Sequence, residues 1–200
     1  MVGTYFFMSL YLQQVKGYSP LRAGMAFLPI GLATFTAAVA ASRLVRHLGV
    51  RRQLLLAPLL SLGGAIWLSQ INSGTSYFPG LFVPLLVSGI GIGSTFVPLT
   101  LAATAGVPPS ESGLASGLLN TSRQMGGALG LAVLATVASS ASRHQLAQGH
   151  PLSDALTHGY ALAFLVIAAI FAASALTAFL LERGETPSIP PADEEPVVFE

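Results

Sequence analysis

The sequence predicts an all-α membrane protein with six transmembrane helices, and three observations lead to this fold class. Charged residues make up 8% of the 200 residues, whereas soluble domains average about a quarter. Hydrophobic residues reach 52%, and the mean hydropathy is +0.69, which is more apolar surface than one core of this size can bury. The apolar residues also gather into six long runs with short polar connections, so we expect the bilayer to solvate them.

Five of the six runs are long enough to cross a membrane. A spanning helix needs about 20 residues at about 1.5 Å each to cross a hydrocarbon core of about 30 Å. The first run has about 14 residues and reaches only about 21 Å, so we expect a helix truncated at its N-terminus; a true half-crossing helix is the alternative. The six runs are 2–15, 21–42, 53–71, 80–104, 113–141 and 159–181.

A basic cluster between the second and third runs sets the expected orientation. The segment 43–52 holds Arg43, Arg46, Arg51 and Arg52, four of the nine Lys and Arg residues. Short loops rich in Lys and Arg face the cytoplasm. We therefore predict a cytoplasmic loop here, and counting the crossings puts both termini in the cytoplasm and 142–158 in an outer loop.

Two units of unequal size follow from this pattern. Residues 1–183 form the predicted six-helix bundle of a multi-pass cell-membrane protein. Residues 184–200 are rich in Pro and Glu and have few large apolar residues, so we expect a disordered cytoplasmic tail.

An internal similarity predicts that the six helices form two inverted three-helix repeats. Residues 17–26 align without gaps on residues 106–115, with Gly, Pro, Gly and Ala in register. The two copies are three helices apart, so they fall on opposite sides of the membrane, as in an inverted repeat.

Arg123 is the most informative single residue because it is predicted near the middle of the fifth run. An unpaired guanidinium at that depth costs at least about 2.5–3.5 kcal/mol on insertion scales. Asn120 and Gln124 share its helix face by their spacing. The patch is either a substrate contact or gate, or a structural Arg bound to carbonyl groups of a neighbouring kinked helix; both alternatives point the side chain inward.

Two milder polar stripes are further candidates for a substrate cavity. Tyr5, Ser9 and Gln13 recur every fourth residue in the first run, and Ser88 and Thr95 are one heptad apart in the fourth. Ordinary packing through small residues is the alternative. For the small-residue pairs of the fifth run, such as Gly126 and Gly130, we favour helix packing.

Several classes of site are disfavoured by what the sequence lacks. It has no cysteine and no visible nucleophile–base pair, so we predict neither an enzyme nor a cofactor. His144, His150 and His158 have spacings that suit a solvated loop better than a metal site. No basic patch suits nucleic acid. No Asp or Glu lies inside an apolar run, so this chain carries no evident proton carrier.

The basic segment resembles the loop signature of the major facilitator superfamily, Gly-x-Leu-x-Asp-x-x-Gly-x-Arg/Lys-Arg/Lys. Leu44, Gly49, Arg51 and Arg52 match this signature. Ser42 and Arg46 replace the usual glycine and aspartate, a looser form that is typical of the superfamily's second half. The strings 11–24, 96–100 and 113–124 look like the drug:proton antiporter branch with fourteen helices.

This resemblance implies that the chain is the C-terminal half of a multidrug efflux transporter. Such proteins export small amphipathic compounds in exchange for protons by alternating access, and the missing N-terminal half would carry the proton-binding carboxylates. The first and fourth runs would line the cavity, and the gating loop would comprise Arg43, Arg46, Gly49, Arg51 and Arg52. The alternative is a truncated, non-transporting membrane protein that assembles with another half-transporter.

Overall fold

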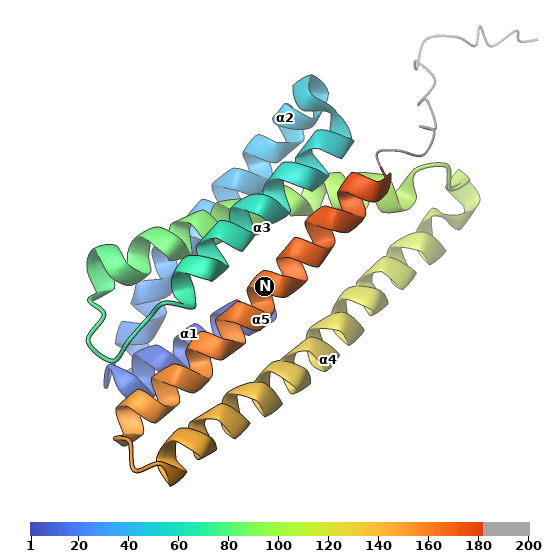
Figure 1. Cartoon of the computed structure of the whole chain (residues 1–200). Coiled ribbons are helices and arrows are strands. Elements are labelled where there is room, and N and C mark those ends of the chain that lie inside the picture. The colour runs from blue at the N-terminus through green and yellow to red at the C-terminus, as the bar shows by residue number, and fades with distance from the viewer. Residues whose placement is uncertain (182–200) are drawn as a thin grey trace, which may run out of the picture.

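The computed structural model describes residues 1–181, and the regular secondary structure of this part is all helical, without strands (Figure 1). The all-α prediction is confirmed. The predicted tail, 184–200, lies outside the described residues. The helices are α1 (Val2–Leu10), the π-helical turn η1 (Tyr11–Val15), α2 (Pro20–Leu68), η2 (Tyr77–Leu81), α3 (Phe82–Thr104), the 3-10 turn η3 (Pro109–Glu111), α4 (Ser112–Ala147) and α5 (Leu152–Leu181).

The long helix α2 is a hairpin of two helical arms, 20–48 and 50–68, that fold back at Gly49. Gly49 has φ 78° and ψ 158°, a backbone conformation that glycine adopts without a Cβ clash. The buried side chain of Gln53 links the arms, because its Nε2 donates to the carbonyl oxygen of Ala41 at 3.2 Å. The predicted loop 43–52 is therefore wrong: helix continues up to Gly49 on both sides, since Arg and Leu are good helix formers outside lipid as well.

Four helices in the described part are long and apolar enough to cross a membrane: α2, α3 with η2, α4 with η3, and α5. Because α2 folds back at Gly49, it supplies two of the predicted crossings. The first run is present as α1 and η1 and is as short as its sequence indicates. Each of the six predicted runs is thus helical, whereas their inverted-repeat relationship and their orientation stay predictions.

The connection between α4 and α5 is much shorter than predicted. The sequence places a loop at 142–158, but α4 continues to Ala147 and α5 begins at Leu152. The end of an apolar run marks where lipid ends, and a helix with polar side chains can extend past it. His144 and His158 consequently lie on helices and only His150 lies in the connection, and no group of three metal-ligating side chains occurs among residues 1–181.

Glycines hold α3 tightly between the two arms of α2. A Cβ on Gly89 would lie 2.7 Å from Ile30, and one on Gly93 would overlap the backbone of Thr34 in the first arm. On the other side, a Cβ on Gly91 would overlap Ser61 of the second arm. The order of these contacts along the chain shows that α3 runs parallel to the first arm and antiparallel to the second. The helix α3 therefore ends at the same end of the bundle as the Gly49 turn.

The remaining helices form the other side of the bundle. The helices α4 and α5 run antiparallel, with Gly159 pressed against Ser142 and Ala138. The short helix α1 packs on both through Gly3, whose Cβ position is 3.3 Å from Ile167. A buried cluster around α1 and α5, including Phe7, Met8 and Phe164, joins the two sides.

At the end opposite Gly49, the first two connections are tied together by side chains. The hydroxyl of Tyr11 donates to the carbonyl oxygen of Asn72 at 2.7 Å, and Lys16 Nζ donates to that of Ser73 at 2.7 Å. Partial burial lowers the pKa of Lys16 below its ordinary value. These bonds fix the position of the first short helix relative to α2.

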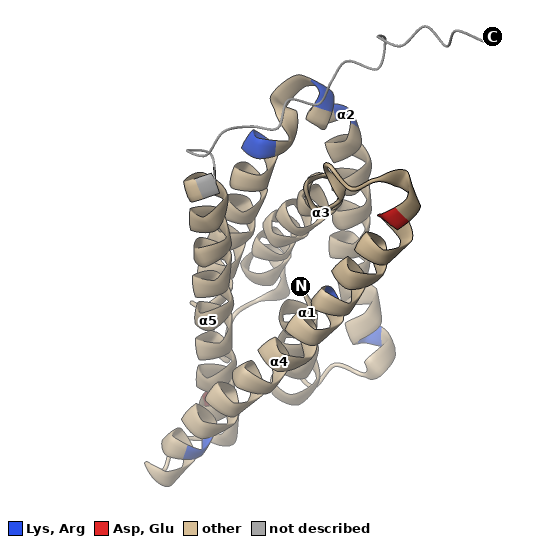
Figure 2. Cartoon of the chain, turned by 90° about the vertical axis from the view of Figure 1, so that its right-hand side faces the viewer, with Lys and Arg blue, Asp and Glu red and all other residues tan. Residues whose placement is uncertain are grey.

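The outer surface of the bundle is apolar over most of its length. Leu21 and Leu114 are each 75% exposed, and Leu28 and Phe35 are exposed to similar extents. Figure 2 shows that most of the ribbon carries no Lys, Arg, Asp or Glu. Exposing so large an apolar surface to water is unfavourable, so the exposed apolar side chains face lipid.

Candidate functional site

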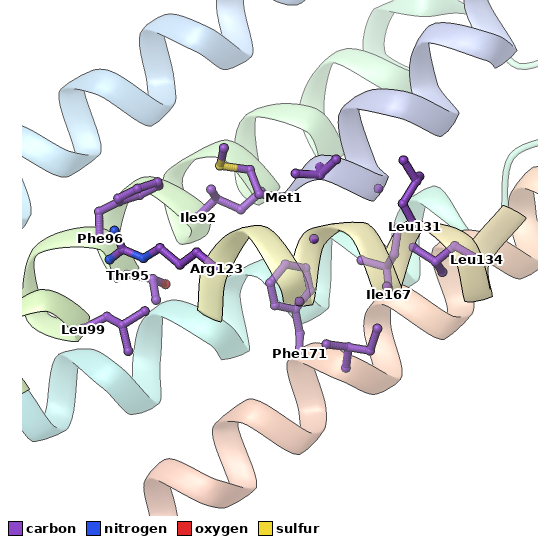
Figure 3. A pocket seen from close by; sticks show the side chains of 16 residues that line it. Met1, Ile92, Thr95, Phe96, Leu99, Arg123, Leu131, Leu134, Ile167 and Phe171 are labelled. Carbon is purple, nitrogen blue, oxygen red and sulfur yellow. The ribbon is translucent and has the colours of Figure 1, made fainter. Parts of the chain in front are cut away.

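A cavity of about 370 Å³ opens where the N-terminal end of α1 meets α3, α4 and α5 (Figure 3). This volume is within the range of small-molecule sites, which are mostly apolar with a few polar groups. Its lining is Met1, Val2 and Gly3 of α1; Ile92, Thr95, Phe96 and Leu99 of α3; Arg123, Gly126, Gly127, Gly130, Leu131 and Leu134 of α4; and Ile167, Ile170 and Phe171 of α5. Arg123 is the one charged side chain in this lining.

Arg123 reaches across the cavity from α4 to α3. Its Nη2 donates to Thr100 Oγ1 at 3.1 Å, and its Cζ lies 5.2 Å from the centroid of the Phe96 ring. Figure 3 shows the guanidinium directed at Phe96. The Thr100 hydroxyl itself donates to the carbonyl oxygen of Phe96 at 2.9 Å, which leaves its lone pairs for Arg123. The partners are thus a hydroxyl and an aromatic face, and not the kinked-helix carbonyls that the structural alternative expects.

Three glycines of α4 form a flat wall of the cavity. A Cβ on Gly126 or Gly130 would have no heavy atom within 4 Å, and one on Gly127 would be 3.6 Å from Val2. The sequence favours helix packing for Gly126 and Gly130, but within residues 1–181 nothing packs there. The Gly-xxx-Gly spacing is ambiguous because a small residue also leaves room for a ligand.

The two predicted polar residues of α3 have different surroundings. Thr95 lines the cavity and its hydroxyl donates to the carbonyl oxygen of Gly91 at 2.9 Å. Ser88 is 1% exposed and lies against Gly64 of the second α2 arm, away from the cavity lining. Its Oγ has no hydrogen-bond partner within the described residues.

The predicted stripe of the first helix does not reach the cavity. The Tyr5 hydroxyl lies 3.4 Å from Thr34 Oγ1 of α2. Gln13 donates to Ser9 within the helix at 2.8 Å. None of these three side chains belongs to the lining of the cavity that holds Arg123.

The remaining two residues of the Arg123 patch diverge. Gln124 borders a more open groove next to the cavity, and Arg123, Val2 and Gly127 also line this groove. Asn120 is exposed on α4 and lines neither space. The structure therefore brings Thr95 and Arg123 together, with Gln124 at the edge.

Sequence reasoning missed the aromatic and hydroxyl partners of Arg123. Phe96 and Thr100 stand at the two ends of the 96–100 string, which carries part of the family resemblance, so a signal for them existed. Ile170 and Phe171 of α5 lie in an uninterrupted apolar run and give no such signal.

The residues of the predicted gating loop lie at the tip of the α2 hairpin. Arg43, Arg46 and Arg52 are exposed, and Arg51 is partly buried. Gly49 makes the turn between them through its positive φ.

The helices and the cavity together define a multi-pass helical membrane protein with a space for a small molecule. Sequence comparison agrees, because residues 1–131 match the family model described as Major Facilitator Superfamily. The chain belongs to the major facilitator superfamily.

Curated relatives extend the match over nearly the whole chain. The chain is 34% identical over 192 residues to the puromycin resistance protein pur8 of Streptomyces alboniger, covering 92% of this chain and 38% of that protein. It is 37% identical over 194 residues to the cephamycin export protein CmcT of Amycolatopsis lactamdurans, covering 94% of this chain and 38% of that protein. A tetracycline resistance determinant of Streptomyces rimosus is 30% identical over 145 residues, or 72% of this chain and 42% of that protein. The chain thus spans about 40% of the length of these relatives.

Proposed function

We propose that this chain is the C-terminal part of an efflux transporter that exports small amphipathic, drug-like compounds from the cytoplasm. The observation that carries the proposal is Arg123 held against Phe96 and Thr100 among apolar helices, in a chain that belongs to a transporter family. The names of the relatives, which concern antibiotic resistance and export, support the outward direction and the class of substrate. Family membership also favours a transporter over an enzyme.

In this proposal the cavity binds the apolar body of the substrate and Arg123 binds a polar group on it. Ile92, Leu131 and Phe171 contribute apolar lining, and the glycine wall of α4 leaves room for a flat molecule. A guanidinium at an apolar site is stabilised by hydrogen bonds and by an aromatic face, so the contacts with Thr100 and Phe96 lower the cost of keeping Arg123 there. A substrate that takes over one of these contacts makes the α3–α4 link dependent on occupancy.

Alternating access and proton antiport are the second part of the proposal. Among residues 1–181 the acidic residues are Glu111 and Asp154, and both lie near helix ends outside the cavity lining. Arginine cannot release a proton near neutral pH. The proton-binding carboxylates therefore belong to the N-terminal half of the transporter, which pairs with this chain, and the Gly49 turn with its arginines acts at the cytoplasmic surface.

The experiment that tests this function is an efflux assay on the full-length gene product in a host that lacks its own drug exporters. Cells are loaded with a fluorescent amphipathic dye, and the initial export rate is measured for the wild type, Arg123→Ala and Gln124→Ala at matched membrane expression. We expect export in the wild type, a collapse when an uncoupler removes the proton gradient, and a strong loss for Arg123→Ala. No export by the wild type would reject the efflux function, and unaltered export by Arg123→Ala would remove this residue from the mechanism.

The same assay separates the alternative of a non-transporting assembly partner. In that case the expressed chain confers no export by itself but alters the export rate when it is co-expressed with a second half-transporter. The matched control is a co-expressed chain that carries Gly93→Ala, which disturbs its fold without touching the cavity.

A further inference from the structure

The tip of the α2 hairpin presents a concentrated positive charge. We call Arg43, Arg46, His47, Arg51 and Arg52 the basic turn. Arg43, Arg46, His47 and Arg52 are exposed. Figure 2 shows Lys and Arg gathered at this tip of α2. Arg43 and Arg46 are three residues apart on one helical arm and so share a face, while Arg52 stands on the other arm just past Gly49.

Two of the basic side chains at the opposite end are bound differently. Lys16 Nζ donates to the carbonyl oxygen of Ser73 at 2.7 Å. The guanidinium carbon of Arg22 lies 4.0 Å from the centroid of the Tyr18 ring. These two cations contact the protein itself, whereas Arg43, Arg46 and Arg52 are exposed at the tip.

Few carboxylates oppose this charge within the described chain. Among residues 1–181, Glu111 and Asp154 are the acidic residues. Glu111 follows α3, which runs parallel to the first arm of α2, so it lies at the Gly49 end but on a different connection. Asp154, in the first turn of α5, lies at the other end. Counting residues 1–181 alone, the tip therefore has more basic than acidic side chains.

The arms place this charge at the surface of the bilayer. Below the tip, Val39 and Leu56 are exposed on the arms, a pattern that requires lipid contact. The tip of a hairpin whose arms lie in lipid emerges at the headgroups, where phosphate is the abundant anion. A guanidinium binds phosphate with paired hydrogen bonds.

We propose that the basic turn binds the phosphate groups of anionic lipids, through Arg43, Arg46 and Arg52. The chemistry is charge attraction reinforced by hydrogen bonds, and each arginine near an anionic surface strengthens binding about fivefold. Binding at this site anchors the hairpin tip to one leaflet and makes its position depend on lipid composition. This inference does not depend on the transported compound.

The test measures lipid binding to the purified full-length gene product in detergent by native mass spectrometry. The protein is titrated with an equimolar mixture of phosphatidylglycerol and phosphatidylcholine, and the dissociation constant of each bound lipid is compared. We expect the triple variant Arg43→Gln, Arg46→Gln and Arg52→Gln to weaken phosphatidylglycerol binding roughly a hundredfold at its tightest site, with phosphatidylcholine unchanged. Arg143→Gln, at the opposite end, is the matched control and keeps the wild-type value.

A second variant distinguishes lipid attraction from a specific contact with another part of the protein. Replacing the same three arginines by lysine preserves the charge but removes the planar fork. We expect this variant to retain most of the phosphatidylglycerol binding, and an equal loss in the Lys and Gln variants would overturn the proposal. Thermal unfolding of each variant in detergent shows that the fold is kept.

Two further measurements exclude other sources of negative charge. Displacement of phosphatidylglycerol by inorganic phosphate, but not by chloride at equal ionic strength, would make the turn a site for free phosphate and overturn the lipid assignment. Residues 182–200 carry six of the chain's eight acidic residues. If phosphatidylglycerol binds only after residues 184–200 are removed, the acidic segment occupies the turn and the proposal fails.

Discussion

The guanidinium of Arg123 on α4 lies 5.2 Å from the ring centroid of Phe96 on α3, and its Nη2 hydrogen-bonds to Thr100 one turn further along the same helix. Two helices on different sides of the cavity are thus joined by side chains that can separate without any change in the helices themselves. A link of this kind suits the alternating access that we propose for this transporter. It also explains how a charged residue remains stable in an apolar lining.

The first prediction concerns this link. We expect Arg123→Ala to reduce the initial export rate at least about tenfold, because the substrate loses its polar contact and α3 loses its link to α4; tenfold corresponds to about 1.4 kcal/mol, within the range of a cation–π contact combined with a charge-assisted hydrogen bond. Arg123→Lys should recover only part of the rate, since lysine keeps the charge but lacks the planar fork. The measurement is dye export per unit of membrane protein.

Gln124→Ala is the control for this prediction. Gln124 borders the neighbouring groove, and its side chain is not part of the cavity lining. We expect less than a threefold change in export for this variant. Equal losses of export in both variants would show that a place in the cavity lining is not what makes Arg123 necessary for export.

Sequence reasoning located Arg123 but not the partners of its side chain. The cost of a charge in an apolar run marks the residue, and the spacing along the helix gives its face. Neither quantity gives the register between α4 and α3, which brings Phe96 and Thr100 within reach only after the helices pack.

The errors at the loops have a common physical cause. Hydropathy reports where lipid contact ends, whereas a helix ends where its backbone hydrogen bonds end. At 43–52 and 142–158 polar side chains continue the helix beyond the apolar run, so the predicted loops shrink to the Gly49 turn and to the short connection around His150. The order of helices was predictable because it depends on hydropathy alone.

The second prediction tests the cavity by filling it. The Cβ position of Gly130 has no heavy atom within 4 Å and Gly130 lines the cavity, so Gly130→Leu directs a side chain into the cavity. We expect this variant to keep its thermal unfolding midpoint and to lose export of large dyes more than of small ones. Gly130→Ala, which adds one methyl group, should have a minor effect. Export of all dyes at the wild-type rate by Gly130→Leu would place the substrate path elsewhere.

The third prediction concerns the close packing of α3 against α2. A Cβ on Gly93 would overlap the backbone of Thr34, which cannot move away as a flexible side chain could. We expect Gly93→Ala to destabilise the fold by about 1–3 kcal/mol, as overpacking does in other tightly packed interiors. Thermal unfolding in detergent, followed by helical circular dichroism, measures this loss.

Gly31→Ala is the matched control for the α3 contact. Gly31 lies on the first α2 arm, and its Cβ position has nothing within 4 Å. Alanine is the better helix former by up to about 1 kcal/mol, so this variant should be as stable as the wild type or slightly more so. An equal loss of stability in both variants would show that the close approach of α3 to α2 is not responsible.

The fourth prediction concerns the turn at Gly49. Its φ of 78° with ψ of 158° belongs to a region that residues with a Cβ essentially never adopt, and forcing one there costs about 1–3 kcal/mol. Gly49→Ala should therefore lower the unfolding midpoint, while Gly63→Ala, in the helical part of the second arm with an open Cβ position, should not. Asparagine often replaces glycine at positive φ, but only where ψ is near 47° as in the left-handed helix. We thus expect Gly49→Asn to be as destabilised as Gly49→Ala, and recovery of the wild-type midpoint by asparagine would show that the arms meet through an ordinary left-handed turn.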